Sequence, residues 1–154
     1  ATVYPPEIYR RIYDSSINPR ELESVRARFP YDSITLERTG CFGTCPVYTI
    51  TLYRSGKAEL NAVNHLPALG HFVGEVDIFT YGRLCYLIDH SQFKSFKDWY
   101  EAGWTDASTC IVTAVSGATQ KRVSEYGAVG PIELWGIQQT IDSLRLGIEW
   151  KVAP

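Results

Sequence analysis

The sequence contains no methionine and has little excess charge of either sign. Its 154 residues include 15 Lys and Arg against 17 Asp and Glu, which gives a formal net charge of −2. Domains that bind nucleic acid usually carry a basic patch and a high pI. Here the pI is near 5.9, and no dense run of Lys or Arg is present. We therefore expect no nucleic-acid partner.

Long apolar runs are missing as well. No stretch reaches the roughly 18–20 residues that a membrane-spanning helix needs, so we expect no membrane span. Hydrophobic residues nevertheless make up 45% of the chain and aromatic residues 13%. This composition excludes intrinsic disorder and suits a single globular domain that buries a core without a structural metal.

The common motifs of catalysis are also absent. The sequence has no Gly-x-Ser-x-Gly nucleophile elbow and no Gly-x-x-x-x-Gly-Lys phosphate loop. No other spacing brings a nucleophile and a base together. We assign no catalytic residue and no cofactor, and we favour a binding function over an enzymatic one, although a catalytic group assembled only in space stays open.

The first 32 residues are expected to form an N-terminal arm with one short helix. Asn18 is suited to cap this helix, Pro19 to occupy its first turn, and Pro30 to end it. Apolar residues then recur on one helical face between these limits. Because this stripe is narrow, the helix has to pack on the main domain or fray. The main domain is expected to span residues 33–154.

From Ser33 the pattern becomes that of a strand, because Ile34 and Leu36 alternate with polar residues. A run of β-branched and aromatic residues over 46–53 suggests a strand that is covered on both faces. Gly56 suits the tight turn of a hairpin to the next strand, 57–60. A second hairpin is expected from 109–115 and 121–126, and 72–76 and 148–152 are further candidate strands.

Helices are expected in three places of the main domain. Asp77 is suited to cap a helix over 78–88, and Ser91 is suited to cap a second helix that ends before Gly103. The third helix has the clearest pattern; it begins at Pro131 and ends at Gly147. Hairpins and helices in this order predict an α+β fold, an antiparallel sheet built from two hairpins with helices packed on one face.

The most informative stretch is Cys41-Phe42-Gly43-Thr44-Cys45-Pro46, between two expected strands. Thiols four residues apart in a turn can bond if the loop curls, and the preferred interpretation is a disulfide between Cys41 and Cys45 that clamps the turn. Two reduced cysteines that merely pack are one alternative. Cys85 and Cys110 lie in apolar contexts, where we expect two buried free thiols, with a bond between them as the alternative.

Two reactive alternatives for Cys41 and Cys45 stay open. A redox pair is one, although its thiols usually sit at a helix N-terminus, and here Pro46 leads into a strand. A soft-metal site for copper or zinc is the other. That site would need one of the three histidines to approach, which the spacing does not indicate.

The motif Arg38-x-x-Cys41-Phe42-Gly43-x-Cys45-Pro46-x-Tyr48 resembles the signature of a bacterial domain family of unknown function. The resemblance spans roughly residues 33–150 and leaves out the first 32 residues. Cys85 and Cys110 are not expected to belong to the shared pattern. In its second half the similarity is carried by a further set of positions: Asp106, 109–115, 121–123, Tyr126, Gly127, Ile141, Asp142 and Leu144. The resemblance supports the α+β fold and implies that the protein is exported, but it implies no reaction and no ligand.

These observations favour a non-enzymatic, exported binding domain. Its partner is expected to be a protein or a cell-envelope component, contacted through Arg38, Phe42, Tyr48 and Tyr126. The alternative is a thiol-redox or soft-metal protein that uses Cys41 and Cys45. We expect a periplasmic or extracellular location, with a cytoplasmic one as the alternative. The sequence does not indicate an oligomeric state.

Overall fold

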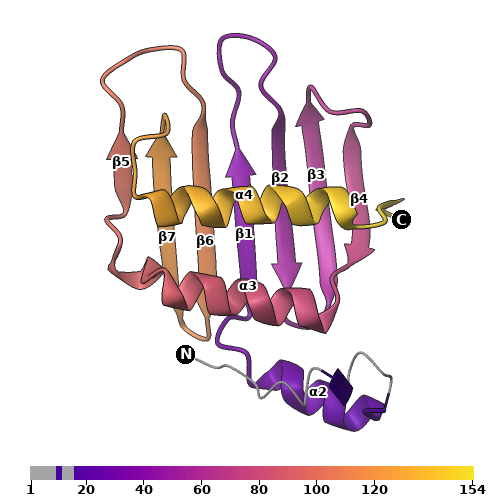
Figure 1. Cartoon of the computed structure of the whole chain (residues 1–154). Coiled ribbons are helices and arrows are strands. Elements are labelled where there is room, and N and C mark those ends of the chain that lie inside the picture. Colours follow the sequence, from indigo (N-terminus) through magenta and orange to yellow (C-terminus); the bar gives the residue numbers. More distant parts are fainter. Residues whose placement is uncertain (1–9, 12–15) are drawn as a thin grey trace.

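One sheet of eight strands organises the chain, in the order β5-β7-β6-β1-β2-β3-β4-β8 (Figure 1). The computed structural model describes residues 10–11 and 16–154, so residues 1–9 and 12–15 of the expected N-terminal arm lie outside the described residues. The strands are β1 (Ser33–Arg38), β2 (Val47–Tyr53), β3 (Lys57–Asn64), β4 (Gly70–Glu75), β5 (Trp99–Glu101), β6 (Thr109–Ser116), β7 (Thr119–Tyr126) and β8 (Lys151–Val152). The helical elements are α2 (Pro19–Ala27), α3 (Ile78–His90), the short 3₁₀ turn η1 (Phe93–Ser95) and α4 (Ile132–Gly147).

Most strands pair antiparallel, and β5 lies parallel to β7. The α+β class predicted from the sequence is therefore confirmed. The hairpins β2–β3 and β6–β7 are present, but the sheet extends beyond them because β1, β4, β5 and β8 pair as well. None of the helices that the structure describes is long and apolar enough to cross a membrane.

The two faces of the sheet are covered differently. Along β2, buried and half-buried residues alternate, so Tyr48, Ile50 and Leu52 point to the covered face and Thr49 and Thr51 to the other. Helices α3 and α4 lie on one side of the sheet (Figure 1). The prediction that this strand is covered on both faces is therefore wrong. Its many β-branched residues favour the pleated strand conformation, and they do so even though helices cover only one face of the sheet.

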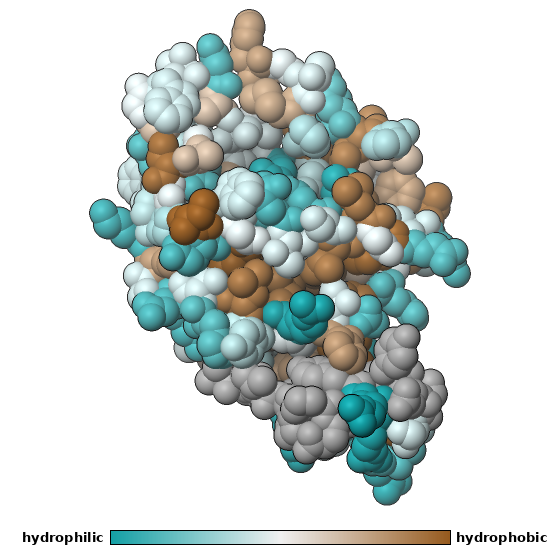
Figure 2. Space-filling model, in the orientation of Figure 1, coloured by the Kyte–Doolittle hydropathy of each residue, from teal (hydrophilic) through white to brown (hydrophobic). Residues whose placement is uncertain are grey.

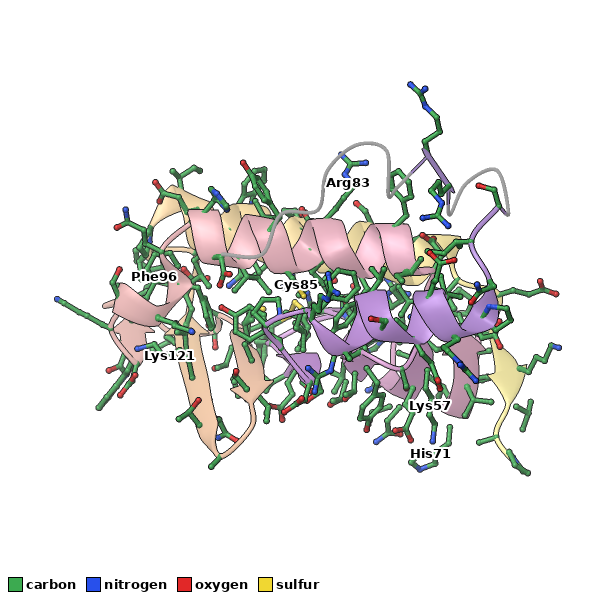
Figure 3. The ribbon with its side chains drawn as sticks, turned by 90° about the horizontal axis from the view of Figure 1, so that it is seen from below. Lys57, His71, Arg83, Cys85, Phe96 and Lys121 are labelled. Atoms are coloured by element: carbon green, nitrogen blue, oxygen red, sulfur yellow. A yellow bond between two sulfur atoms is a disulfide. The ribbon has the colours of Figure 1, made fainter. Side chains whose placement is uncertain are left out.

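Seen from below, helices α3 and α4 lie on one side of the sheet and the open face lies on the other (Figure 3). Lys57 and His71 are on the side away from α3 and α4, and Cys85 points from α3 toward the sheet. The core therefore fills the layer between the helix pair and the sheet, and the other face carries mostly polar, partly exposed side chains together with a few apolar ones such as Ile111.

The helix ends follow the capping residues that the sequence offers. The Asn18 side chain accepts a hydrogen bond from the Glu21 amide, and the Asp77 side chain accepts one from the Thr80 amide. Each bond satisfies a first-turn amide that has no partner within its helix. These contacts fix where α2 and α3 begin, as predicted.

The helix expected after Ser91 does not form. Gln92 takes a left-handed conformation with φ of 58°, only η1 follows, and Phe96 is extended. The chain then continues into the edge strand β5. The Asp98 carbonyl accepts a hydrogen bond from the Ser124 amide, so pairing with β7 replaces the expected helical turns.

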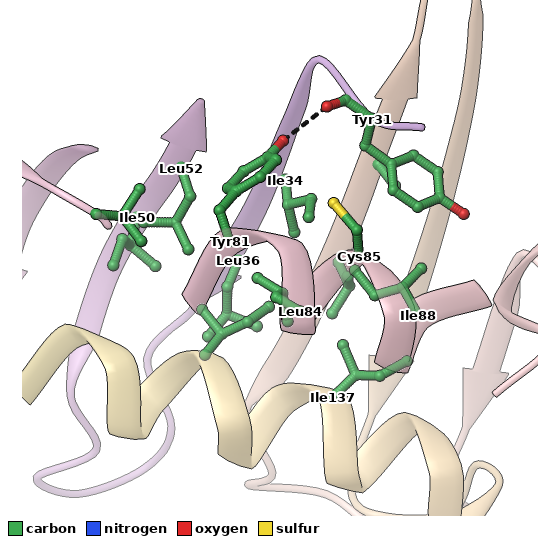
Figure 4. Close-up of a cluster of buried hydrophobic side chains, with 14 of the residues drawn as sticks. Tyr31, Ile34, Leu36, Ile50, Leu52, Tyr81, Leu84, Cys85, Ile88 and Ile137 are labelled. Carbon is green, nitrogen blue, oxygen red and sulfur yellow. Dashed lines mark hydrogen bonds between the residues drawn. The ribbon is translucent and has the colours of Figure 1, made fainter. Parts of the chain in front are cut away.

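The core joins α3 and α4 to the central strands (Figure 4). Tyr81 of α3 is fully buried, and its hydroxyl donates a hydrogen bond of 2.8 Å to the Tyr31 carbonyl. Val25 and Phe29 also enter the core, so α2 packs on the domain as its narrow stripe requires. Cys85 is a buried free thiol, as predicted.

Candidate functional site: a clamped loop above a polar row

The connection between β1 and β2 is a loop closed by a disulfide. Cys41 and Cys45 are bonded, which confirms the preferred interpretation of their spacing. Gly43 has a φ of +149°, a conformation that residues with a side chain rarely adopt, so glycine is needed inside this small ring. Phe42 is 88% exposed, although phenylalanine is among the residue types most often buried. We call residues 39–46 the clamped loop.

The clamped loop is anchored at its first residues. The Thr39 amide donates to the Thr109 carbonyl at 3.0 Å, and the Thr109 amide donates to Thr39 Oγ1 at 2.9 Å. One residue earlier, Arg38 donates from Nη2 to Oδ2 of Asp142 at 2.6 Å and from Nε to Oδ1 at 3.2 Å. Because two parallel hydrogen bonds fix the guanidinium plane, the root of the loop is held to both β6 and α4.

The electrostatics of Arg38 reflect this pairing. Burial by itself would lower the pKa of the guanidinium, but the hydrogen bond to Asp142 and the surrounding negative groups raise the pKa of Arg38 above its ordinary value. The side chains of Arg38 and Asp142 are only 20% and 23% exposed. Arg38 therefore stays charged in a partly buried ion pair, and both groups are occupied by each other.

Arg38 belongs to a row of residues that crosses the sheet on its covered face. The strand register places Glu125 opposite Cys110, Cys110 opposite Arg38, and Arg38 opposite Tyr48. These four residues of β7, β6, β1 and β2 form what we call the polar row. Such a row is unusual in a core layer, since buried polar groups need partners.

Helix α4 contacts three of the four because it runs across the strands from β7 toward β4 (Figure 1), although the buried Tyr48 hydroxyl has no hydrogen-bond partner among the described residues. Positions 138, 142 and 145 lie on one side of the helix. Each meets a different member of the polar row: Gln138 Nε2 donates to Glu125 Oε1 at 2.9 Å, Asp142 accepts from Arg38, and the Arg145 guanidinium carbon lies 4.5 Å from the centre of the Tyr48 ring.

Glu125 is a buried carboxylate with two donors. It is 5% exposed, and its Oε2 accepts from the Gly130 amide at 2.7 Å while Oε1 accepts from Gln138. The Gly130 amide lies just before α4. Glu125 therefore ties the entry of α4 to β7 and acts structurally, because both carboxylate oxygens already accept hydrogen bonds.

Cys110 is the second buried free thiol, as predicted. Burial raises the pKa of its thiol to about 12, and the positive charge of Arg38 lowers it only in part. The thiol is therefore protonated at neutral pH and is a poor nucleophile or metal ligand.

The residues predicted to bind a partner lie in different environments. Phe42 is at the surface, while Arg38 is occupied by Asp142. Tyr48 is 2% exposed because its position in β2 points inward, so it cannot contact a macromolecule directly. Tyr126 is half-buried, and its hydroxyl accepts a hydrogen bond of 3.2 Å from the Ala107 amide. The structure brings Arg38 and Tyr48 together as neighbours and places Phe42 beyond them.

The redox and metal alternatives for the clamped loop both need free thiols, so the disulfide would first have to be reduced. With Cys41 and Cys45 bonded, neither sulfur is a thiolate available to a soft metal. Within residues 10–11 and 16–154, no group of three or more His, Cys, Asp and Glu side chains is arranged to hold a metal ion.

Sequence reasoning missed Gln138, Glu125 and Arg145 as members of this site. The available signal was the spacing of 138, 142 and 145, which places three polar residues on one side of a helix that is otherwise apolar toward the core. Asp142 appeared only through the resemblance to a family. A polar stripe within the buried face of a helix indicates polar partners on the element that it covers.

A family of domains of unknown function, DUF6438, matches the chain over residues 32–145, which include the clamped loop, the polar row and most of α4. No curated protein matches the chain.

Proposed function

The chain belongs to the DUF6438 domain family, and for this member we propose a binding function outside the cytoplasm, in which the clamped loop contacts a protein or cell-envelope partner. The observation that carries the proposal is the 88% exposure of Phe42 inside a ring closed by a disulfide. A single exposed apolar side chain is common on protein surfaces, but a disulfide that fixes a phenylalanine in solvent suits a surface that a partner covers.

Rigidity at this position favours binding. A ring of five residues leaves the loop few conformations to lose, so docking Phe42 costs little conformational entropy. Aromatic anchors also provide a large share of the binding free energy at protein interfaces. In this arrangement Arg38 and Tyr48 support the root of the loop from inside, while Phe42 makes the contact.

A second loop supports the same surface. Tyr126 accepts a hydrogen bond from the Ala107 amide and so holds residues 102–108 near the end of β7. Trp104 in this segment is 59% exposed, and atoms of its ring would lie 3.4 Å from a Cβ placed on Gly127. The loop at 102–108 leads into Thr109, which is bonded to the root of the clamped loop, so the two exposed aromatic residues belong to adjoining loops.

The disulfide supports a location outside the cytoplasm. Structural disulfides persist in oxidising compartments and are rare where glutathione and thioredoxin keep thiols reduced. The periplasm or the extracellular space is therefore the proposed site of action.

Site-specific photo-crosslinking tests the proposal. A photoreactive phenylalanine analogue replaces Phe42 in one sample and Val152, which is 77% exposed on β8, in a matched control. Irradiation in cells of the source organism is expected to give one dominant adduct from position 42 and none of the same mass from position 152. The adduct should weaken when unlabelled wild-type protein competes but not when Phe42→Ser competes. Equal adducts from both positions, or equal competition by both proteins, would refute the proposal.

A further inference from the structure

A small pocket lies apart from the clamped loop, where the end of α4 meets the β3–β4 connection. Its volume is about 210 Å³, below the roughly 300–1,000 Å³ of sites for drug-sized ligands. Hydrophobic side chains gather on this side of the molecule, over the C-terminal end of α4 (Figure 2). The lining is apolar apart from one cation: Leu60, Leu66, Pro67, Ala68, Phe72, Leu146, Trp150 and Arg145.

Arg145 differs from Arg38 in having no counter-ion. Among the described residues, no carboxylate lies within 4.0 Å of its guanidinium, and its buried Nε has no hydrogen-bond partner. The guanidinium lies over the Tyr48 ring at 4.5 Å, which holds the charge in place without neutralising it. Because Nε is shielded from solvent, only the terminal nitrogens of this guanidinium can meet a ligand that enters from the pocket.

Neighbouring contacts fix Arg145 rather than occupy its charged end. The Arg145 carbonyl accepts a hydrogen bond of 2.9 Å from Trp150 Nε1, which places the Trp150 ring against the end of α4. The pocket therefore has a preformed apolar wall and a positioned cation, and the ligand that complements both is an anion with an apolar tail.

We propose that this pocket binds a small aliphatic carboxylate, with the carboxylate at the Arg145 guanidinium and the hydrocarbon chain against Leu60, Phe72 and Trp150. A carboxylate accepts two parallel hydrogen bonds from a guanidinium, and the limited volume favours a short chain over a long one. The site is separate from the clamped loop and does not depend on the binding function proposed for it.

The exposed residues around the pocket agree with an apolar ligand. Leu146 in the lining is 75% exposed, Leu69 next to Ala68 is 54% exposed, and Val152, which pairs with Phe72, is 77% exposed. Apolar side chains scattered singly on a surface are common, but here Leu146 lines the pocket and the other two adjoin lining residues, in sequence or by strand pairing. A hydrocarbon chain that leaves the pocket would contact Leu146 first.

Titration calorimetry of the full chain with octanoate, with octanol as the uncharged comparator, tests this proposal. Octanoate is expected to bind saturably and at least about tenfold more tightly than octanol, because only the acid pairs with Arg145. The Trp150 indole N–H resonance should shift over the same concentrations. Absence of saturable binding up to millimolar octanoate, or equal affinity for octanol, would overturn the proposal.

Variants then locate the site. Arg145→Gln is expected to bring octanoate affinity down to that of octanol, and Arg145→Lys to restore part of it. Ala68→Phe fills the pocket from an exposed loop without touching the core, and it should abolish binding of both ligands. Arg122→Gln on the exposed side of β7 is the matched charge control and should bind as the wild type does. Wild-type affinity in Ala68→Phe would place the ligand elsewhere and reject the site.

Discussion

Arg38 and Asp142 are 104 positions apart in the sequence, yet two hydrogen bonds join them inside the helix–sheet layer. The pair connects the last residue of β1, directly before the clamped loop, to the middle of α4. Because each partner is more than three quarters buried, loss of one would leave the other charge poorly solvated. The pair therefore couples the fold of α4 to the position of the loop.

Replacing the carboxylate of this pair is expected to destabilise the fold. Asp142→Asn should lower the free energy of unfolding by about 2 kcal/mol, measured by urea denaturation, because Arg38 keeps its charge and loses its counter-ion. Asp98→Asn is the matched control, since Asp98 pairs with Lys121 but its side chain is 83% exposed. The control should change stability by less than about 0.5 kcal/mol. Equal effects of the two changes would contradict a special role of the buried pair.

Cysteine labelling distinguishes the clamped loop from a reactive dithiol. Native protein treated with iodoacetamide at neutral pH is expected to take up no label, because Cys41 and Cys45 are bonded and Cys85 and Cys110 are buried. Unfolding without reductant should expose two thiols, and unfolding with reductant four. Intact mass spectrometry reads these states directly. Two labels in the native protein, on Cys41 and Cys45, would instead show that these thiols are reduced, which rules out the disulfide and leaves the packed-cysteine, thiol-redox and metal alternatives.

Removal of the disulfide should weaken the fold only moderately. In the chain-entropy treatment a ring of five residues contributes about 2 kcal/mol, so the double change Cys41→Ser and Cys45→Ser should lower the free energy of unfolding by about that amount. Phe42→Ser is the control, because it leaves the disulfide intact and removes only an exposed aromatic side chain. It should leave the free energy of unfolding nearly unchanged. A much larger loss in the double variant would mean that the loop contributes to the core as well.

Local patterns in the sequence were sufficient for most elements. Asn18 and Asp77 cap their helices through bonds to amides three residues ahead, and such contacts depend on neighbours in the chain. The small turn at Gly56, with φ of +98°, is local in the same way. These features could be predicted because the interacting groups lie within one turn of each other.

The polar row could not be predicted, because it depends on strand register and on the direction of a distant helix. Cys110 faces Arg38 only after β6 has paired with β1, and Asp142 reaches Arg38 only because α4 crosses the strands. The incorrect prediction of a helix after Ser91 has a related cause. Pairing with β7 stabilises residues 99–101 as a strand, and the sequence next to these residues does not indicate that pairing.

The fold should lose stability in alkaline solution. Burial raises the pKa of Cys85 and of Cys110 to about 12, against an ordinary value of 9.0. Above pH 9 the unfolded chain therefore releases these thiol protons while the folded chain keeps them. The unfolded state then binds fewer protons, so the free energy of unfolding falls as pH rises from about 9 to 12. Urea denaturation at a series of pH values measures this fall.

A cysteine variant identifies the origin of the pH effect. Cys110→Ala removes one of the two thiols, and the free energy of unfolding should then fall less steeply above pH 9 than in the wild type. Burial also raises the pKa of Tyr31 and of Tyr81, so part of the slope will remain. An unchanged slope in Cys110→Ala would show that this thiol is not shielded in the folded protein.

The entry of α4 offers a steric test of the buried carboxylate. A Cβ on Gly130 would lie 2.6 Å from Oε2 of Glu125 and 3.1 Å from Cδ2 of Leu134. Gly130→Ala should therefore push the Glu125 carboxylate away from the Gly130 amide and from Gln138, which leaves buried polar groups without partners. We expect the free energy of unfolding to fall by about 1–3 kcal/mol in urea denaturation. Gly103→Ala is the matched control, because a Cβ there meets no atom within 4 Å, and it should be nearly neutral. If Gly130→Ala were as stable as Gly103→Ala, the Glu125 side chain would have room to move, and its role in fixing α4 to β7 would have to be abandoned.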